Sequence, residues 1–114
     1  MRPRRTAKYL HDVLAAGESA MRLSTGMSFD EYLQDEAVRL AVERQFITIG
    51  EALTQLDRLD PDMVARIEHA REIIGFRNVL VHGYSVIDDR VVWSALQSDL
   101  AILMRQVRDL LEQP

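Results

Sequence analysis

The sequence predicts an all-α protein, an antiparallel bundle of four or five helices. Apolar residues recur at spacings of three and four along most of the chain, which is the period of an amphipathic helix. Proline, which breaks helices, occurs only at positions 3, 61 and 114. Alternation typical of a strand is confined to a weak candidate at Tyr84 to Ile87. Short loops between such helices favour antiparallel neighbours.

The first helix is predicted from Thr6 to about Leu23, and the run Ser24-Thr25-Gly26 ends it. A second helix start follows at Ser28, where a serine and the glutamate three residues later, Glu31, form a capping-box pattern. Each of these side chains can accept a hydrogen bond from the other residue's backbone N–H. The spacing then predicts one long helix from Phe29 to about Leu56.

This long helix carries two apolar stripes, which places it at the centre of a bundle or between a core and a partner subunit. Between the stripes, Asp35, Arg39 and Glu43 recur at every fourth position. Two interpretations of these three residues remain open: a surface ladder of ion pairs, or a polar patch that faces a second chain.

Asp60 and Pro61 form an N-cap followed by proline at the first helical position, so a third helix is expected from there to about Ile74. Gly75 weakens helix formation at that point. The following stretch, Arg77 to Val81, is compatible with a continuing or newly started short helix. Its Val79 and Leu80 are expected to face the core.

Gly83 is expected to end this segment in a left-handed conformation. A last helix begins near Asp88 or Asp89 and runs to about Glu112. A length of 114 residues without internal repeats favours a single domain over the whole chain, residues 1–114.

Composition excludes several classes of protein. The chain has no Cys, which excludes disulfide frameworks, thiolate nucleophiles and cysteine-based zinc sites, and we expect no metal. No apolar run is long enough to span a membrane, and a cytoplasmic protein is expected. The net charge of −4 argues against a broad basic surface for RNA, so any contact with nucleic acid has to be local or built by assembly.

Candidate catalytic residues gather in one short segment. His11 and His69 lie in charged helical stretches and are expected to be solvated surface residues. His82 differs, because Arg77 and Asn78 precede it closely. At 100° per residue, Asn78 and His82 share one face of a helix, one turn apart.

These groups suit the cleavage of a phosphodiester bond without a metal ion. A histidine can take a proton from a ribose 2′-OH or give one to the leaving 5′-oxygen. Arg77 can hold the phosphate, and Asn78 can orient the imidazole or bind a phosphate oxygen. One histidine does not readily act as base and acid in one step, so a symmetric dimer would supply the second. In the structural alternative, Arg77 and His82 only complement a helix end.

The sequence resembles the HepT-like toxins of the HEPN superfamily, small helical ribonucleases encoded beside a minimal nucleotidyltransferase. The resemblance covers most of the chain and rests on a set of motifs in the family's order and spacing. These motifs are Asp35, Arg39-Leu40-Ala41-Val42-Glu43-Arg44, Ile49-Gly50-Glu51-Ala52, Pro61, Arg77-Asn78-x-x-x-His82-x-Tyr84 and Val91-Val92-Trp93.

The resemblance implies a homodimer in which Arg77 and His82 of both protomers line a cleft, with Asn78 as an auxiliary polar residue. It implies a metal-independent endoribonuclease that acts on tRNA or mRNA and needs no cofactor of its own. It further implies that a nucleotidyltransferase antitoxin transfers AMP from ATP to Tyr84, which neutralises the toxin. A second interpretation remains open: a non-catalytic module that docks and regulates the nucleotidyltransferase. A plain structural bundle is the third.

Overall fold

The computed structural model describes residues 4–83 and 87–113, which form an all-α fold. Along the chain, the described elements are the α-helices α1 to α7, with one π-helical turn, η1, between α6 and α7. Their bounds are α1 Arg4–Ser24, α2 Phe29–Gln34, α3 Glu36–Leu59, α4 Pro61–Ala65, α5 Ala70–His82, α6 Asp89–Ser94, η1 Ala95–Asp99 and α7 Leu100–Glu112. The described residues contain no strand, in agreement with the predicted fold class.

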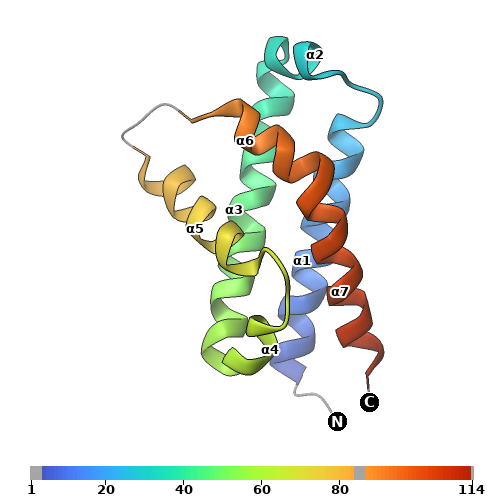
Figure 1. Cartoon of the computed structure of the whole chain (residues 1–114), viewed down its shortest axis with the longest axis vertical. Helices are drawn as coiled ribbons and strands as arrows, with labels where there is room; N and C mark the ends of the chain where they lie inside the picture. Colours follow the sequence, from blue (N-terminus) through green and yellow to red (C-terminus); the bar gives the residue numbers. More distant parts are fainter. Residues whose placement is uncertain (1–3, 84–86, 114) are drawn as a thin grey trace.

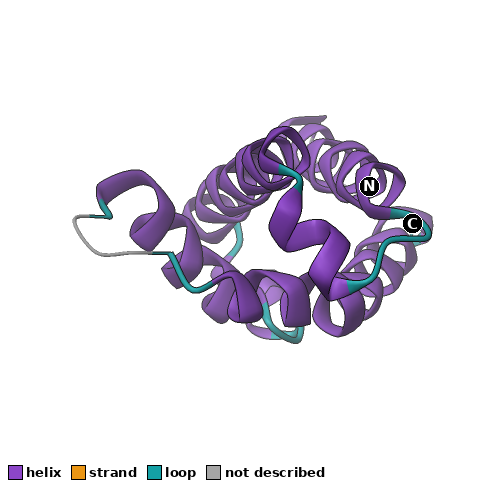
Figure 2. Cartoon of the chain, turned by 90° about the horizontal axis from the view of Figure 1, so that it is seen from above, coloured by secondary structure: helices purple, strands orange, loops and turns teal. Residues whose placement is uncertain are grey.

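The helices form an up-down-up-down bundle of 46 × 31 × 19 Å. In Figure 1, α1 and α5 run upwards, while α3 and the rod formed by α6, η1 and α7 run downwards. α3 packs against both α1 and α5, and α1 also packs against α7. Seen from above in Figure 2, the C-terminal end of α5 stands outside the ring of the other helices. The predicted antiparallel bundle is confirmed.

The core lies between α1, α3 and α7. Its largest fully buried side chains include Leu10, Phe46, Ile49 and Leu103. Each such side chain contributes on the order of 2 kcal/mol through burial. The second apolar stripe of α3 behaves differently, because its Leu40 is 57% exposed. Within one chain, only one of the two predicted stripes is therefore covered.

The predicted helix from Phe29 to Leu56 is wrong at one position. The capping box of Ser28 and Glu31 forms as expected and starts α2. At Asp35, however, the backbone leaves the helical region, with φ −105° and ψ 90°. The Asp35 carboxylate accepts a hydrogen bond from the backbone N–H of Val38 at 3.0 Å and so caps a new helix, α3. Asp35 therefore acts as a helix cap.

The predicted helix from Pro61 to Ile74 is also interrupted. Asp60 caps it as expected, accepting from the N–H of Met63 at 3.1 Å, but α4 ends at Ala65. The chain turns through residues 66–69, and His69 adopts a left-handed conformation with φ 69°. This conformation is uncommon for a residue other than glycine. It redirects the chain into α5.

α5 is continuous through Gly75, where an added β-carbon would meet no atom within 4 Å. The helix ends at His82, as predicted. Gly83 follows it with φ −64°, so the expected left-handed cap is wrong. Val79 is 48% exposed instead of facing the core, whereas Leu80 is partly buried against the core as expected. The C-terminal half of α5 therefore presents apolar side chains to solvent.

The last predicted helix is confirmed as a rod that continues from Asp89 to Glu112. Asp88 caps it by accepting from the N–H of Arg90 at 3.0 Å, and the π-helical turn η1 lies within it. Of the weak strand candidate at Tyr84 to Ile87, residues 84–86 lie outside the described residues, and Ile87 belongs to no strand. None of the described helices has the length and apolarity that a membrane span requires.

Candidate active site

Arg77 lies at a close crossing of α3 and α5. Its side chain begins directly over Gly50 of α3, and a β-carbon added at position 50 would lie only 2.8 Å from the Arg77 γ-carbon. It would also lie 3.3 Å from the carbonyl oxygen of Ile73. Glycine is therefore the residue that leaves room for α5 at this crossing.

The guanidinium of Arg77 is held by two neighbours. It donates a hydrogen bond to Oδ1 of Asn78 at 3.0 Å, and it lies 3.6 Å from Oε1 of Glu51 on α3. The Arg77 Nε atom is buried and has no hydrogen-bond partner among the described residues. With 26% of its side chain exposed, the cation is fixed in place and still reachable by an anion.

Asn78 and His82 are both exposed on α5. Because the helix is regular from Ala70 to His82, they lie one turn apart on one face, as predicted. Arg77 precedes His82 by five residues, a rise of about 7.5 Å along the helix axis. Among the described residues, no hydrogen bond or ion pair joins His82 to Arg77 or Asn78. Tyr84 lies outside the described residues.

A pocket of about 320 Å³ opens beside Arg77, between α3 and α5. Residues from both helices line it: Glu51, Thr54, Gln55, Arg58, Ile74, Arg77 and Asn78. The sequence analysis did not predict that α3 contributes polar residues to this pocket. Its four polar residues recur at the spacing of one helix face, which is the signal that could have shown it.

The model of the family described as "Ribonuclease HepT-like" matches residues 13–110 of this chain. The chain belongs to the HepT-like ribonuclease family. This confirms the family resemblance on which the site assignment rests. The match extends from the middle of α1 to the last turns of α7, and so includes α3 and α5 with the pocket between them.

Curated relatives of this HepT-like chain carry ribonuclease names. It is 27% identical over 105 residues to "Putative RNase TTE0752" of Caldanaerobacter subterraneus subsp. tengcongensis, covering 92% of this chain and 93% of the relative. It is 30% identical over 99 residues to "Probable ribonuclease HepT" of Thermococcus cleftensis, covering 83% and 86%. It is 24% identical over 107 residues to "Putative RNase MJ1380" of Methanocaldococcus jannaschii, covering 94% and 97%. No solved structure matches the chain.

The second group of predicted site residues in this HepT-like chain does not form a ladder. Asp35 is occupied in capping α3. Arg39 is half-buried, and its Nε atom has no hydrogen-bond partner among the described residues. The described ion pairs of 4 Å or less include none between Asp35, Arg39 and Glu43. The surface ion-pair ladder, one of the two open interpretations, is therefore absent.

Glu43 lies in a partly desolvated environment near Arg39. Burial raises the pKa of its carboxyl group, nearby Asp89 raises it further, and Arg39 lowers it. Behind these residues, the Tyr32 hydroxyl is fully buried without a hydrogen-bond partner among the described residues, and burial raises its pKa. The HepT-like chain therefore carries a cluster of polar groups, not fully satisfied, at the end of the bundle that holds α2.

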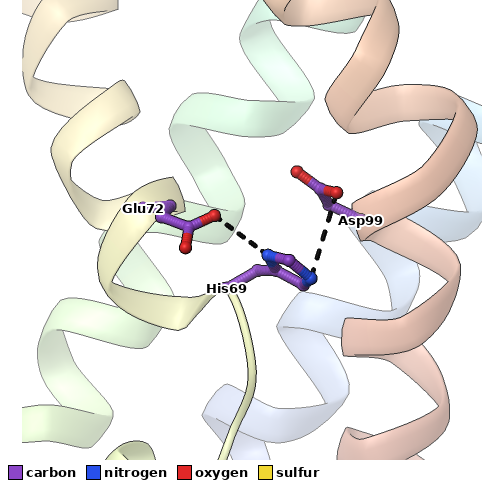
Figure 3. A group of neighbouring side chains, drawn as sticks. All are labelled: His69, Glu72 and Asp99. Carbon is purple, nitrogen blue, oxygen red and sulfur yellow. Dashed lines mark hydrogen bonds and ion pairs between the residues drawn. The ribbon is translucent and has the colours of Figure 1, made fainter.

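His69 is not the solvated residue that the sequence led us to expect. Figure 3 shows its ring between Glu72 of α5 and Asp99 of η1. Its Nδ1 lies 2.9 Å from Glu72 Oε2, and its Nε2 lies 3.9 Å from Asp99 Oδ1. The hydrogen bond to Glu72, with Asp99 and Glu68 nearby, raises the pKa of His69. When it is protonated, His69 links α5 to the last helical rod through these two contacts.

The same three side chains are the described residues of this chain most suited to a metal ion. One nitrogen of His69 and one oxygen each from Glu72 and Asp99 lie within 4.8 Å of one another. The donor set of one imidazole and two carboxylates is one that zinc accepts. The ion pairs of a charged His69 account for the same arrangement without a metal. The cluster lies at the opposite end of α5 from His82.

Proposed function

We propose that this chain is a metal-independent endoribonuclease, the toxin of a type VII-like toxin–antitoxin system, built as a single HEPN domain over residues 1–114. Its substrate is tRNA or mRNA in the cytoplasm. The observation that supports this most directly is the Arg77 guanidinium, held beside Asn78 in the lining of a polar pocket. A fixed, half-buried cation of this kind suits a phosphate.

In the proposed reaction His82 transfers protons and Arg77 stabilises charge. One His82 takes the proton of a ribose 2′-OH, whose oxygen then attacks the adjacent phosphorus. The bond to the 5′-oxygen breaks, and a second, protonated His82 donates a proton to that oxygen. Arg77 neutralises the charge that develops on the phosphoryl oxygens, and Asn78 holds the phosphate or the imidazole. The products are a 2′,3′-cyclic phosphate and a free 5′-OH.

The need for two histidines leads us to propose a homodimer. Val79 and Val81, at 48% and 43% exposure, lie close to His82 on α5 and form apolar surface that a second copy would cover. Pairing of this face would bring two copies of Arg77 and His82 together, which creates a positive cleft on a chain of net charge −4. We place Asp35, Arg39 and Glu43, with exposed Leu40, at the edge of the same interface as polar support.

We further propose that Tyr84 is the site of regulation. A minimal nucleotidyltransferase antitoxin transfers AMP from ATP to its hydroxyl, so ATP is a substrate of the partner and the toxin itself carries no cofactor. Tyr84 follows His82 by two residues. The added phosphate therefore brings negative charge near Arg77 and repels RNA.

Cleavage of labelled cellular RNA by purified protein in EDTA tests the proposed chemistry. We expect Arg77→Ala and His82→Ala to lower the rate at least about 100-fold while the helical circular dichroism is retained. The matched control is Arg105→Ala, because Arg105 is exposed on α7, outside the pocket. Wild-type rates in both site variants would refute the assignment. Tight binding to the nucleotidyltransferase without cleavage of any RNA would favour the non-catalytic docking module.

Intact mass spectrometry after incubation with the partner and ATP tests the regulation. We expect wild-type protein to gain the mass of one or more AMP groups and Tyr84→Phe to gain none. The Tyr84→Phe variant should remain toxic in the presence of the antitoxin. Tyr9→Phe is the control, because Tyr9 lies on α1. An AMP increment that persists on Tyr84→Phe would contradict the assignment.

A further inference from the structure

The pocket beside Arg77 contains polar groups that the proposed chemistry does not use. Gln55 and Arg58 of α3 line it together with Glu51 and Thr54. Among the described residues, none makes a hydrogen bond or ion pair with the Gln55 amide or the Arg58 guanidinium. Polar groups arranged around a concave site without protein partners are suited to a ligand.

The remaining polar groups of the pocket differ in what they can still bind. The Thr54 hydroxyl donates to the Gly50 carbonyl oxygen at 2.8 Å, which leaves its oxygen as an acceptor. Asn78 already accepts from Arg77 through Oδ1, which leaves its amide hydrogens as donors. Gln55 offers both a donor and an acceptor. A pocket that offers both donors and acceptors is complementary to the edge of a nucleobase, which also carries both. An anion carries acceptors only and would be bound by donors alone.

We propose that this pocket binds the nucleotide adjacent to the scissile phosphate of a single-stranded RNA. Gln55 contacts the base and Arg58 contacts the next phosphate, while Arg77 holds the phosphate that reacts. The inference rests on the proposed ribonuclease function and names the substrate class of that site: RNA with an unpaired base. A paired base does not have its edge available to enter such a pocket.

The dimensions and charges of the pocket support one nucleotide. Its volume of about 320 Å³ lies at the lower end of the range for sites that take small organic molecules. Glu51 places a carboxylate 3.6 Å from the Arg77 guanidinium, which disfavours a second phosphate at that point of the pocket. A carboxylate accepts hydrogen bonds from exocyclic amino groups, so cytosine, adenine or guanine is favoured over uracil.

The test compares Gln55→Ala and Arg58→Ala with Arg105→Ala on a pool of single-stranded RNA of random sequence. We expect Arg58→Ala to raise KM about tenfold with little change in kcat, because a phosphate contact outside the reacting centre is lost. We expect Gln55→Ala to flatten the base preference next to the cut, read by sequencing the products. Double-stranded RNA of the same sequences should be cleaved at least about tenfold more slowly.

A failure of the pocket assignment can be distinguished from a failure of the proposed ribonuclease function. If Arg77→Ala abolishes cleavage while the Gln55 and Arg58 variants keep the wild-type KM and base profile, the pocket assignment is wrong and the ribonuclease proposal stands. If the wild type cleaves nothing, fluorescence anisotropy with a labelled single-stranded RNA decides. Weaker binding by Gln55→Ala and Arg58→Ala than by Arg105→Ala then supports the pocket, and equal binding by all variants refutes it.

Discussion

The side chain of Arg77 rests on Gly50, a residue 27 positions earlier in the chain and in another helix. This contact sets the height of α5 above α3 at the point where the candidate site begins. The position of the guanidinium is therefore a property of helix packing as well as of its own rotamer. Changes in α3 that leave every site residue intact can still displace it.

Substitution of Gly50 by alanine tests this relationship. The added β-carbon would meet the root of the Arg77 side chain, which has little freedom to move away, so α5 must shift. We expect a loss of about 1–3 kcal/mol in the free energy of unfolding, measured with urea. We also expect RNA cleavage to fall further than the folded fraction accounts for.

Gly75→Ala is the matched control, since Gly75 lies in α5 with open space around it. Alanine there should be neutral or should stabilise the protein by up to about 1 kcal/mol, because glycine lowers helix propensity. Equal effects of the two substitutions would show that close packing at Gly50 is unimportant.

A second prediction concerns Glu51 as a positioning residue for Arg77. Removal of its charge in Glu51→Gln weakens the contact at 3.6 Å, so the guanidinium samples more orientations. We expect kcat for RNA cleavage to fall about tenfold. Glu51→Asp, which keeps the charge, should recover part of this loss.

The control for Glu51 is Asp57→Asn. Asp57 also joins α3 to α5, through two hydrogen bonds of 2.7 Å from Arg71, away from the pocket. Loss of this pair should change cleavage less than twofold, because surface ion pairs contribute about 0–1 kcal/mol to stability. If Asp57→Asn lowers kcat as much as Glu51→Gln does, Glu51 has only a structural role.

A third prediction concerns Glu43. Its pKa is raised in the folded protein, so folding favours the protonated carboxyl group. This contribution to stability is complete below the usual value of 4.5 and is lost as the pH rises through the folded pKa. In Glu43→Gln that loss disappears. Urea unfolding between pH 4 and 8 should show the variant gaining stability relative to wild type as the pH rises, and a parallel pair of curves would contradict this.

A fourth prediction concerns the contacts of His69 with Glu72 and Asp99. The raised pKa of His69 means that its stabilising effect is present below 6.5 and is lost as the pH rises through the folded value. The hydrogen bond to Glu72 is the largest cause of the raised pKa of His69. Glu72→Gln removes the carboxylate, so the pKa of His69 should fall towards 6.5. Titration of the imidazole proton signals by NMR measures this shift. Glu112→Gln, an exposed change on α7, should leave the titration unaltered, and a shift of the same size there would refute the role of Glu72.

The fold class could be predicted because periodicity and helix caps are local signals. Ser28 with Glu31, and Asp60 with Pro61, start helices where their sequence patterns indicate. Asp35 was misjudged because its spacing to Arg39 fits a helix face equally well. Only the tertiary structure shows that the backbone breaks there and that the carboxylate caps α3.

The candidate site was only partly predictable for the same reason. Arg77, Asn78 and His82 are close in sequence, so helical geometry relates them directly. Gln55 and Arg58 reach the site only because α3 crosses α5 at Gly50, a contact between residues far apart in the chain. His69 was misjudged because its left-handed backbone and its partner Asp99 follow from how α5 meets η1.

The uneven attachment of α5 has a consequence for motion. Ala70 and Ile73 anchor its first turns in the core, and Arg71 ties them to α3, whereas its last turn carries Val79, Val81 and His82 on open surface. Amide hydrogen exchange should therefore be slow up to Arg77 and fast beyond it. If Arg77 binds the phosphate and His82 transfers the proton as proposed, the first group lies in the well-packed part of α5 and the second in its exposed last turn. A partner that orders this final turn would control the proposed RNA cleavage by fixing the position of the His82 imidazole, without moving Arg77.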